Sequence, residues 1–416
     1  MNIIKNLKAL EILDSRGRPT VKAYCELDSG TTGSASVPSG ASTGKAEAHE
    51  LRDGELRFDG LGCKKAVNNI ETIIQQDVRG RKFSSQQELD LLLTQLDGTP
   101  NKSRLGANSI LAVSLAFARA VASESRIPLY QYFSNMGKTD LQFLPRPTIN
   151  LFSGGIHAGG QVPVQDLLLV PKQHKLDQVY DATYRIYNSA AGLSSRKYGV
   201  RTLSADEGGL APPFTNQTAM FEDAMEAIRE TGFEAGREIA LALDVASSHF
   251  YDKGKYQINE TSLDGPAMIG LLESWSNDYP IISIEDGLHE EDWENWSILM
   301  ETMKGKCLIL GDDLLCTNPT RINHAIQQNA ANALLLKVNQ IGTLSEALAS
   351  NNLARNANWS VTISARSGET EDSWLADLAF GWQADFIKVG SITQSERLSK
   401  YNRLLEIERE TGLEIR

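Results

Sequence analysis

Several features that would point to other classes of protein are missing from this sequence. Only four cysteines occur, at Cys25, Cys63, Cys307 and Cys316, and none of them forms a CxxC pair. This scarcity argues against a disulfide scaffold and against a structural zinc site. The sequence also lacks the ~20 uninterrupted apolar residues of a membrane span and the apolar core of a signal peptide. We therefore expect a protein of a reducing, cytoplasmic compartment.

An excess of positive charge is also missing. The formal net charge is -12, whereas nucleic acids and anionic membranes require a basic face on the protein that binds them. We therefore expect neither nucleic acid nor membrane as a partner. A small anionic substrate remains compatible with this charge, because a few local cations or metal ions can override the global field.

The ordinary composition and the length of 416 residues predict two or three domains with sizeable cores. Residues 21–28 alternate apolar and polar side chains, which predicts a half-buried strand, and a second short strand follows at 34–38. From residue 64 the pattern becomes helical, and residues 106–125 predict a tightly packed helix rich in small residues. We place an N-terminal α+β domain at residues 1–135 and a second domain at 136–416.

One pattern recurs through the second domain: an apolar run, then a polar residue, then a helical stretch. The polar residues follow one another at intervals of 22 to 41 residues, which fit one strand, one helix and two loops. They are Asp244, Glu285, Asp312, Lys337, Arg366 and Lys388. Alternating strands and helices predict a parallel sheet covered by helices. Six charged strand ends in succession favour a closed β/α barrel, whose chemistry lies at the carboxyl ends of its strands, over an open sheet with one crevice.

Three of these residues, Asp244, Glu285 and Asp312, are carboxylates at successive strand ends. Each alone could be a helix cap or a solvated loop residue. Together they would converge at the mouth of a barrel, where three unpaired carboxylates repel one another. A hard divalent cation would relieve this repulsion, and oxygen ligands select magnesium over zinc. The pattern therefore indicates a Mg²⁺ site.

Cations follow the carboxylates along the chain. Lys337 ends an apolar strand, where a lysine is costly unless it is paired or used; it is either a general base or the ion-pair partner of a carboxylate. Arg366 offers a planar fork for phosphate or carboxylate, and Ser367 and Lys388 add a hydroxyl and a second ammonium. Glycine-rich loops at 39–44 and 154–160 are suited to binding an anion or to closing over a site.

At this point the residues resemble one family throughout. The segments that carry the resemblance to the enolases run from the first strand to the last helix: SVPSGASTG (36–44), LGANSILAVSLA (105–116), SADEGGLAP (204–212), SIEDG (283–287), GDDLLCTNP (311–319), LLLKVNQIGTLSEAL (334–348), RSGETEDSWLADL (366–378) and SERLSKYNRLLEIE (395–408). The resemblance implies an α+β N-terminal domain packed on an eight-stranded β/α barrel with an irregular start. It also implies a homodimer or a higher homo-oligomer.

The resemblance further implies a magnesium-dependent lyase with two Mg²⁺ ions per site. Asp244, Glu285 and Asp312 would hold the first ion, and Ser39 would contact a second ion that arrives with the substrate. Two ions and a lysine would stabilise the negative charge that develops when a proton beside a carboxylate is removed.

The same resemblance implies roles around the substrate, a small molecule bearing a phosphate or phosphonate. Lys337 would abstract the α-proton, and Glu207 would assist departure of the hydroxyl. Arg366 and Ser367 would hold the phosphate, Lys388 would hold the carboxylate, and His157 would close over the substrate. Gln165 and Ala365 would complete the substrate-binding set.

Two departures from the family pattern stand out. The enolases carry a histidine directly before the Arg-Ser pair, where this chain has Ala365, and a Gln-Glu pair where this chain has Gln165 and Asp166. Both departures fall on the side where the hydroxyl leaves, and the resemblance implies a catalytic role there for Asp166, one methylene shorter than the glutamate of the family. Loss of one acid/base group typically costs ~10²–10⁴ in rate.

Three functions therefore stay open. The first is conversion of 2-phosphoglycerate to phosphoenolpyruvate. The second is a diverged enolase-like synthase of phosphonate or phosphinate biosynthesis, of the carboxyphosphonoenolpyruvate synthase type. The third is a catalytically silent, metal-binding scaffold protein.

Overall fold

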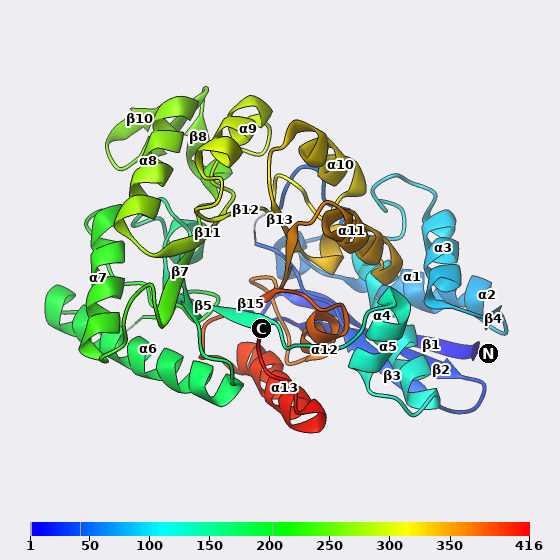
Figure 1. Cartoon of the computed structure of the whole chain (residues 1–416). Coiled ribbons are helices and arrows are strands. Elements are labelled where there is room, and N and C mark those ends of the chain that lie inside the picture. Colours follow the sequence, from blue (N-terminus) through cyan, green and yellow to red (C-terminus); the bar gives the residue numbers. More distant parts are fainter. Residues whose placement is uncertain (1, 42, 202) are drawn as a thin grey trace.

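The computed structural model describes residues 2–41, 43–201 and 203–416. Its N-terminal part contains a four-stranded antiparallel sheet in the order β3-β2-β1-β4 (Figure 1). The strands are β1 (Asn2–Leu13), β2 (Pro19–Leu27), β3 (Thr32–Ser36) and β4 (Lys82–Phe83). The alternation at 21–28 lies in β2 except for its last residue, and the second short strand expected at 34–38 overlaps the end of β3.

Helices cover this sheet on one side. They are α1 (Lys64–Asn69), α2 (Gln75–Val78), α3 (Gln86–Asp97), α4 (Ala107–Glu124) and α5 (Leu129–Gly137), with one π-helical turn at Ile70–Ile74. The small residues of α4 let it approach the sheet closely. A Cβ on Gly33 of β3 would lie only 2.3 Å from the carbonyl oxygen of Ala116 and the backbone nitrogen of Ala120.

The remainder of the chain builds a closed barrel of eight strands, in the order β11-β12-β13-β14-β15-β5-β6-β7. The strands are β5 (Arg146–Ser153), β6 (Asp166–Pro171), β7 (Ile239–Asp244), β11 (Ile281–Glu285), β12 (Leu308–Gly311), β13 (Ala333–Leu336), β14 (Ser360–Ser364) and β15 (Phe386–Gly390). β6 runs antiparallel to both of its neighbours, whereas the other pairings are parallel. The predicted α/β class and the eight-stranded barrel with an irregular start are therefore confirmed.

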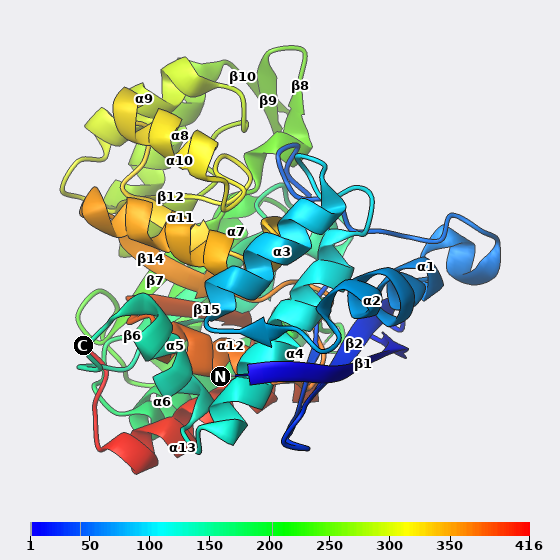
Figure 2. The ribbon, with the colours of Figure 1, turned by 90° about the vertical axis from the view of Figure 1, so that its right-hand side faces the viewer.

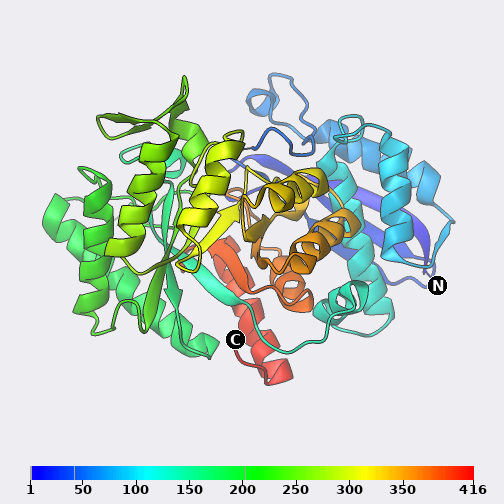
Figure 3. The same cartoon turned by 45° about the horizontal axis from the view of Figure 1, so that its top comes forward.

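Helices surround the barrel, and a small sheet stands beside its mouth (Figure 3). The helices are α6 (Leu176–Tyr198), α7 (Gln217–Glu230), α8 (Gly265–Asp278), α9 (Trp293–Thr302), α10 (Pro319–Gln328), α11 (Leu344–Asn356), α12 (Trp374–Gly381) and α13 (Ser395–Thr411). Short 3-10 turns occur at Arg57–Gly60, Gly155–Ala158, Ser247–Phe250 and Val338–Gln340. The small sheet consists of β8 (Tyr251–Asp252), β9 (Lys255–Ile258) and β10 (Thr261–Leu263).

The N-terminal sheet and its helices lie against the α11–α12 side of the barrel (Figure 2). Asp90 of α3 accepts hydrogen bonds from the backbone and the hydroxyl of Ser345 at the start of α11, at 2.9 and 2.6 Å. Lys102 pairs with Glu346 at 2.8 Å. The division at residue 135 stays a prediction. Within the part of the chain that the structure describes, no helix is both long and apolar enough to cross a membrane.

The N-terminal part also reaches the barrel mouth. Ser39, which follows β3, forms an isolated backbone bridge with Gly368, beyond β14. This bridge places Ser39, the first residue of the glycine-rich segment, beside the chain that follows β14 at the barrel mouth. Residue 42 of that segment lies outside the described residues.

Candidate active site

The polar strand ends read from the sequence lie around one barrel mouth. Asp244 and Glu285 are the last residues of β7 and β11, and Asp312 and Lys337 directly follow β12 and β13. Lys388 differs from the expectation, because β15 continues past it to Gly390. Its side chain nevertheless points inward, since alternate residues of a barrel strand face the interior.

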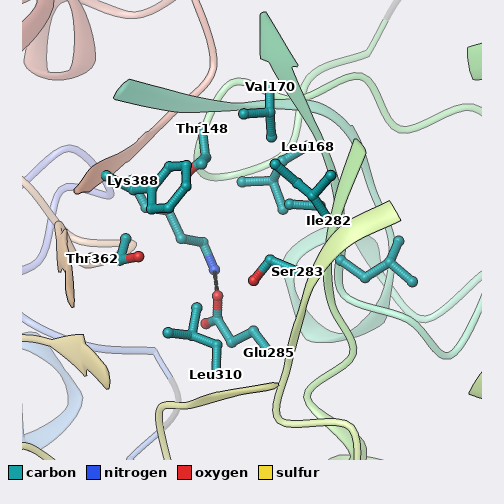
Figure 4. Close-up of a pocket in the computed structure, with 12 residues that line it drawn as sticks. Thr148, Leu168, Val170, Ile282, Ser283, Glu285, Leu310, Thr362 and Lys388 are labelled. Carbon is teal, nitrogen blue, oxygen red and sulfur yellow. Dashed lines mark hydrogen bonds and ion pairs between the residues drawn. The ribbon is translucent and has the colours of Figure 1, made fainter. Parts of the chain in front are cut away.

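Lys388 joins the first two carboxylates. Its ammonium lies 2.8 Å from Asp244 Oδ2 and 2.7 Å from Glu285 Oε2, and all three side chains are at least nine-tenths buried. Burial lowers the pKa of Lys388, but the two carboxylates outweigh that effect and hold the pKa well above its ordinary value. Figure 4 shows the ammonium pointing directly at Glu285. Both side chains, with Ser283, are among those that line a cavity of about 20 Å³. This volume is enough for one water molecule.

Glu285 has a free oxygen at this point. Its Oε1 is buried and has no hydrogen-bond partner among the described residues. An unpaired buried carboxylate oxygen is costly, and burial together with the charge of Asp244 raises the pKa of Glu285 well above its usual range. Asp244, Glu285 and Asp312 offer oxygen atoms only, the ligand chemistry that Mg²⁺ requires. The donor set and the unsatisfied oxygen both fit a magnesium ion.

Lys337 pairs with the third carboxylate. Its Nζ lies 2.5 Å from Asp312 Oδ2. Burial lowers the pKa of Lys337, but Asp312 more than compensates and raises the pKa above its ordinary value. The other oxygen of Asp312 accepts a hydrogen bond from Gln340 at 2.8 Å. The ion pair expected as the alternative to a general base is therefore present, so Lys337 is protonated while it keeps this partner.

A second acidic group adjoins the first and was not singled out from the sequence. Carboxylate oxygens of Asp286, Asp312 and Asp313 lie within 4.8 Å of one another and could hold a metal ion. Asp286, however, already accepts the backbone N–H groups of Asp312 and Asp313, at 3.0 and 2.7 Å. Burial and the charge of Asp312 raise the pKa of Asp286 to about 8. Paired acids in SIEDG and GDD were its only signal in the sequence.

The opposite side of the mouth carries His157, Asp166 and Glu207, whose ligand atoms also lie within 4.8 Å of one another. His157 Nδ1 lies 2.9 Å from Asp166 Oδ2, and its Nε2 lies 4.0 Å from Glu207 Oε1. Burial lowers the pKa of His157, but Asp166 and Glu207 outweigh it and raise the pKa to about 9. For Glu207, burial raises the pKa, but His157 and nearby cations bring it below its ordinary value. The imidazole is therefore the protonated member of this cluster at neutral pH.

Asp166 lies behind the imidazole rather than facing the open mouth. It is fully buried, and its second oxygen accepts a hydrogen bond from the Ser153 hydroxyl at 2.6 Å. The neighbouring Gln165 donates to Asp244 at 3.1 Å, while its own Oε1 is buried without a partner among the described residues. The two residues of this pair thus serve different parts of the site.

Arg366 lies beyond the end of β14 and is almost completely buried. Its guanidinium contacts Glu47 of the N-terminal part at 3.1 and 3.3 Å, and Asn339 at 3.1 Å. Ala365 before it is also buried, and its backbone nitrogen donates to the carbonyl of Lys388 at 2.8 Å. A buried methyl group therefore follows the end of β14, next to Lys388 of β15, where the family pattern has an imidazole.

Ser367 and Ser39, predicted to contact the phosphate and the second magnesium ion, form hydrogen bonds with side chains of the N-terminal part. The Ser367 hydroxyl accepts a hydrogen bond from Arg16 at 3.1 Å. The Ser39 hydroxyl accepts one from Arg52 at 2.7 Å and donates to Glu50 at 3.1 Å. Arginines 16 and 52 were not singled out from the sequence.

The fold and this site together define a β/α-barrel protein whose mouth gathers buried carboxylates and lysines, the arrangement of an enzyme that acts at the carboxyl edge of its barrel. Comparison with protein-family models agrees. Residues 4–133 match the model described as enolase, N-terminal domain, and residues 141–416 match enolase, C-terminal TIM barrel domain. The chain belongs to the enolase family, and its kind of activity is that of the enolase-superfamily lyases.

Proposed function

We propose that this protein is a magnesium-dependent lyase that removes the α-proton of a phosphorylated hydroxy acid and expels water, as in the conversion of 2-phosphoglycerate to phosphoenolpyruvate. The observation that carries the proposal is the convergence of Asp244, Glu285 and Asp312 with two buried lysines at one barrel mouth. A silent scaffold protein would have no use for five buried charges, because each is costly to desolvate.

Lys337 is the proposed base. A base must hold an unshared electron pair, so its Nζ has to give up a proton and its pairing with Asp312. Asp312 would be engaged instead in binding magnesium, which needs oxygen ligands. Burial then favours the neutral amine, since desolvation is the effect that lowers the pKa of this lysine.

Lys388 is the proposed partner of the substrate carboxylate. It already holds two carboxylates in this site, at 2.8 and 2.7 Å. Magnesium, held by Asp244, Glu285 and Asp312, would supply positive charge where negative charge develops on the substrate. A second ion near Ser39 belongs to the same proposal. Arg366 and Ser367 would bind the phosphate, the arginine through its planar fork.

Departure of the hydroxyl requires a proton donor, and the cluster on the opposite side of the mouth supplies one. We assign the proton to His157, because its pKa is raised to about 9 while the pKa of Glu207 is lowered. His157 would give its proton to the leaving hydroxyl and become neutral, while the carboxylate of Glu207 would stabilise the imidazolium before that transfer and orient the leaving group. Asp166, expected to be catalytic, is proposed instead as a positioning residue that holds His157 Nδ1 at 2.9 Å.

Ala365 favours a second candidate, a synthase of the carboxyphosphonoenolpyruvate type. Its methyl group stands where the family has an imidazole, next to Arg366 and Lys388, so this corner of the site has a smaller side chain and lacks one acid/base group. The metal and base side is retained, which is what enolate formation on a phosphonate substrate would need.

An ultraviolet assay tests the proposal. Purified protein with magnesium and 2-phosphoglycerate is followed for formation of the enol double bond, beside the variants Lys337→Ala and Ala365→His. Turnover that Lys337→Ala abolishes would support the first candidate. If the wild type is inactive and binds magnesium, a gain in Ala365→His would assign the loss to the missing imidazole, and phosphonate analogues become the substrates to assay. Activity that survives in Lys337→Ala would remove the lysine from its role.

The proposed assembly is a homodimer or higher homo-oligomer formed through the N-terminal part. Three large apolar or aromatic side chains on β1 and β2 are exposed there: Leu10, Leu13 and Tyr24. Exposed apolar groups that cluster on one face are typical of protein–protein contacts.

A further inference from the structure

One internal carboxylate occupies the arginine that is proposed to bind the substrate phosphate. Glu47 Oε2 lies 3.1 Å from Arg366 Nη1, and Glu47 Oε1 lies 3.3 Å from Nη2. Both terminal nitrogens of the fork thus face one carboxylate, the arrangement with which arginine also binds phosphate. The two side chains are 8% and 3% exposed, so little water screens the pair.

Glu47 is anchored by a short turn of the loop that covers the barrel mouth. The backbone nitrogen of Gly44 donates to Glu47 Oε1 at 3.1 Å, and the backbone nitrogen of Glu47 donates to the carbonyl of Gly44 at 3.1 Å. The turn is seated tightly, because a Cβ on Gly44 would lie 2.4 Å from Cys316 Sγ. The carboxylate therefore reaches Arg366 only while this turn keeps its place.

The same carboxylate is connected to the acidic side of the site. Gln340 Nε2 donates to Glu47 Oε1 at 3.3 Å and to Asp312 Oδ1 at 2.8 Å. The next residue of the loop, Ala48, donates its backbone N–H to the carbonyl of Gln340 at 2.7 Å. Gln340 is completely buried. Its side-chain amide therefore connects Glu47 to Asp312, the ion-pair partner of the proposed base Lys337.

We infer that Glu47 is a specificity-determining residue: an internal anion that competes with the substrate for Arg366, so that only an anion able to displace it binds. This inference rests on the proposed function, in which Arg366 binds the phosphate. The fork cannot hold a carboxylate and a phosphate on the same two nitrogens. Binding of the substrate is therefore coupled to release of the turn at residues 44–47.

Competition of this kind has a quantitative signature. If Arg366 is available in only a fraction of the molecules, the apparent dissociation constant is the intrinsic one divided by that fraction. Removing the competitor then tightens binding by the same factor for every anion. A carboxylate that stayed in place and merely repelled the ligand would instead weaken a dianion more than a monoanion, because Coulomb energy scales with charge.

Titration calorimetry on the magnesium-loaded full chain tests the inference with two tetrahedral probes. Inorganic phosphate, at a pH where it is a dianion, is compared with dimethyl phosphate, a monoanion. The variants are Glu47→Gln, Glu47→Asp, Arg366→Gln and the control Glu55→Gln, which changes an exposed carboxylate of the same N-terminal part. We expect Glu47→Gln to bind both probes ~10–100-fold more tightly, by a common factor, and Glu55→Gln to match the wild type. Glu47→Asp, which keeps the charge and shortens the reach, should show a smaller gain and serves as the test if Glu47→Gln does not fold.

Three results would overturn the inference. Unchanged affinity in both Glu47 variants, with binding abolished by Arg366→Gln, would leave the anion site in place and remove the competition. A gain confined to the dianion would show that Glu47 is not displaced. Binding that Arg366→Gln leaves intact would place the anion elsewhere and would refute the proposed phosphate role together with the inference.

Discussion

Replacing Lys388 with methionine is the perturbation whose consequence follows most directly from the structure. The ammonium holds Asp244 and Glu285 at 2.8 and 2.7 Å, and all three side chains are buried. Lys388→Met keeps most of the side-chain volume but leaves two buried carboxylates facing each other. Removing one partner of a buried ion pair costs about 3–5 kcal/mol. Glu285 will take up a proton and limit the loss of stability, because its pKa is already raised well above the ordinary value.

Magnesium changes this expectation in a specific direction. A ligand that binds only the folded state stabilises it by about 2.7 kcal/mol at a hundredfold excess over its dissociation constant. In Lys388→Met the ammonium no longer competes for Asp244 and Glu285, so magnesium should stabilise the variant more than it stabilises the wild type. The loss of unfolding free energy in Lys388→Met should therefore be large in EDTA and small in magnesium.

Urea unfolding followed by circular dichroism, with EDTA or with magnesium, measures both free energies. Lys253→Met is the matched control, because that lysine side chain is 90% exposed and its loss should change stability by less than about 0.5 kcal/mol. A loss in Lys388→Met that is equal with and without magnesium would refute the reasoning, since the carboxylates would then not be the metal ligands.

Two further predictions concern pH and packing. His157 has a folded-state pKa of about 9 against about 6.5 when unfolded, so its contribution, on the order of 3 kcal/mol, is fully present below pH ~6.5 and is lost as pH rises through 9. Unfolding free energies measured across that interval should fall more steeply in the wild type than in His157→Gln, which keeps the slope from Asp286 with its pKa of about 8; parallel curves would contradict the assignment. Gly33→Ala should lower the unfolding free energy by about 1–3 kcal/mol, because its Cβ would meet the backbone of α4 at 2.3 Å. Gly270→Ala lies at an exposed position of α8, where the added Cβ meets no atom within 4 Å beyond its own turn of helix, and should instead raise the unfolding free energy by up to ~1 kcal/mol. Equal effects of the two alanines would show that α4 moves aside.

The predicted barrel was confirmed because its signal is local and repeated. Each buried strand is a short apolar run, and the helix that follows it is long enough to return the chain to the start of the next strand. The polar residue after each run lies at the barrel mouth whatever the position of its strand in the barrel. Asp244, Glu285, Asp312 and Lys337 could therefore be located from the chain alone. Lys388 was placed at a strand end, although β15 extends to Gly390, because an apolar run marks the end of a strand only approximately.

Partners within the site could not be predicted in the same way. Lys388 meets carboxylates 144 and 103 residues away, and Glu47 meets Arg366 across 319 residues. Likewise, the sequence does not show whether Lys337 is free or paired, whereas the tertiary structure shows that it forms an ion pair with Asp312.

The sequence by itself thus determined the strand and helix order, the closure into a barrel, the family and the chemical types gathered at the mouth, because periodicity and residue type are properties of short segments. Only the tertiary structure decided which charge faces which, that Asp166 stands behind His157, and that Glu47 covers Arg366. Those outcomes depend on distances and burial between remote segments, and burial determines whether a charge is paired, protonated or available to a ligand.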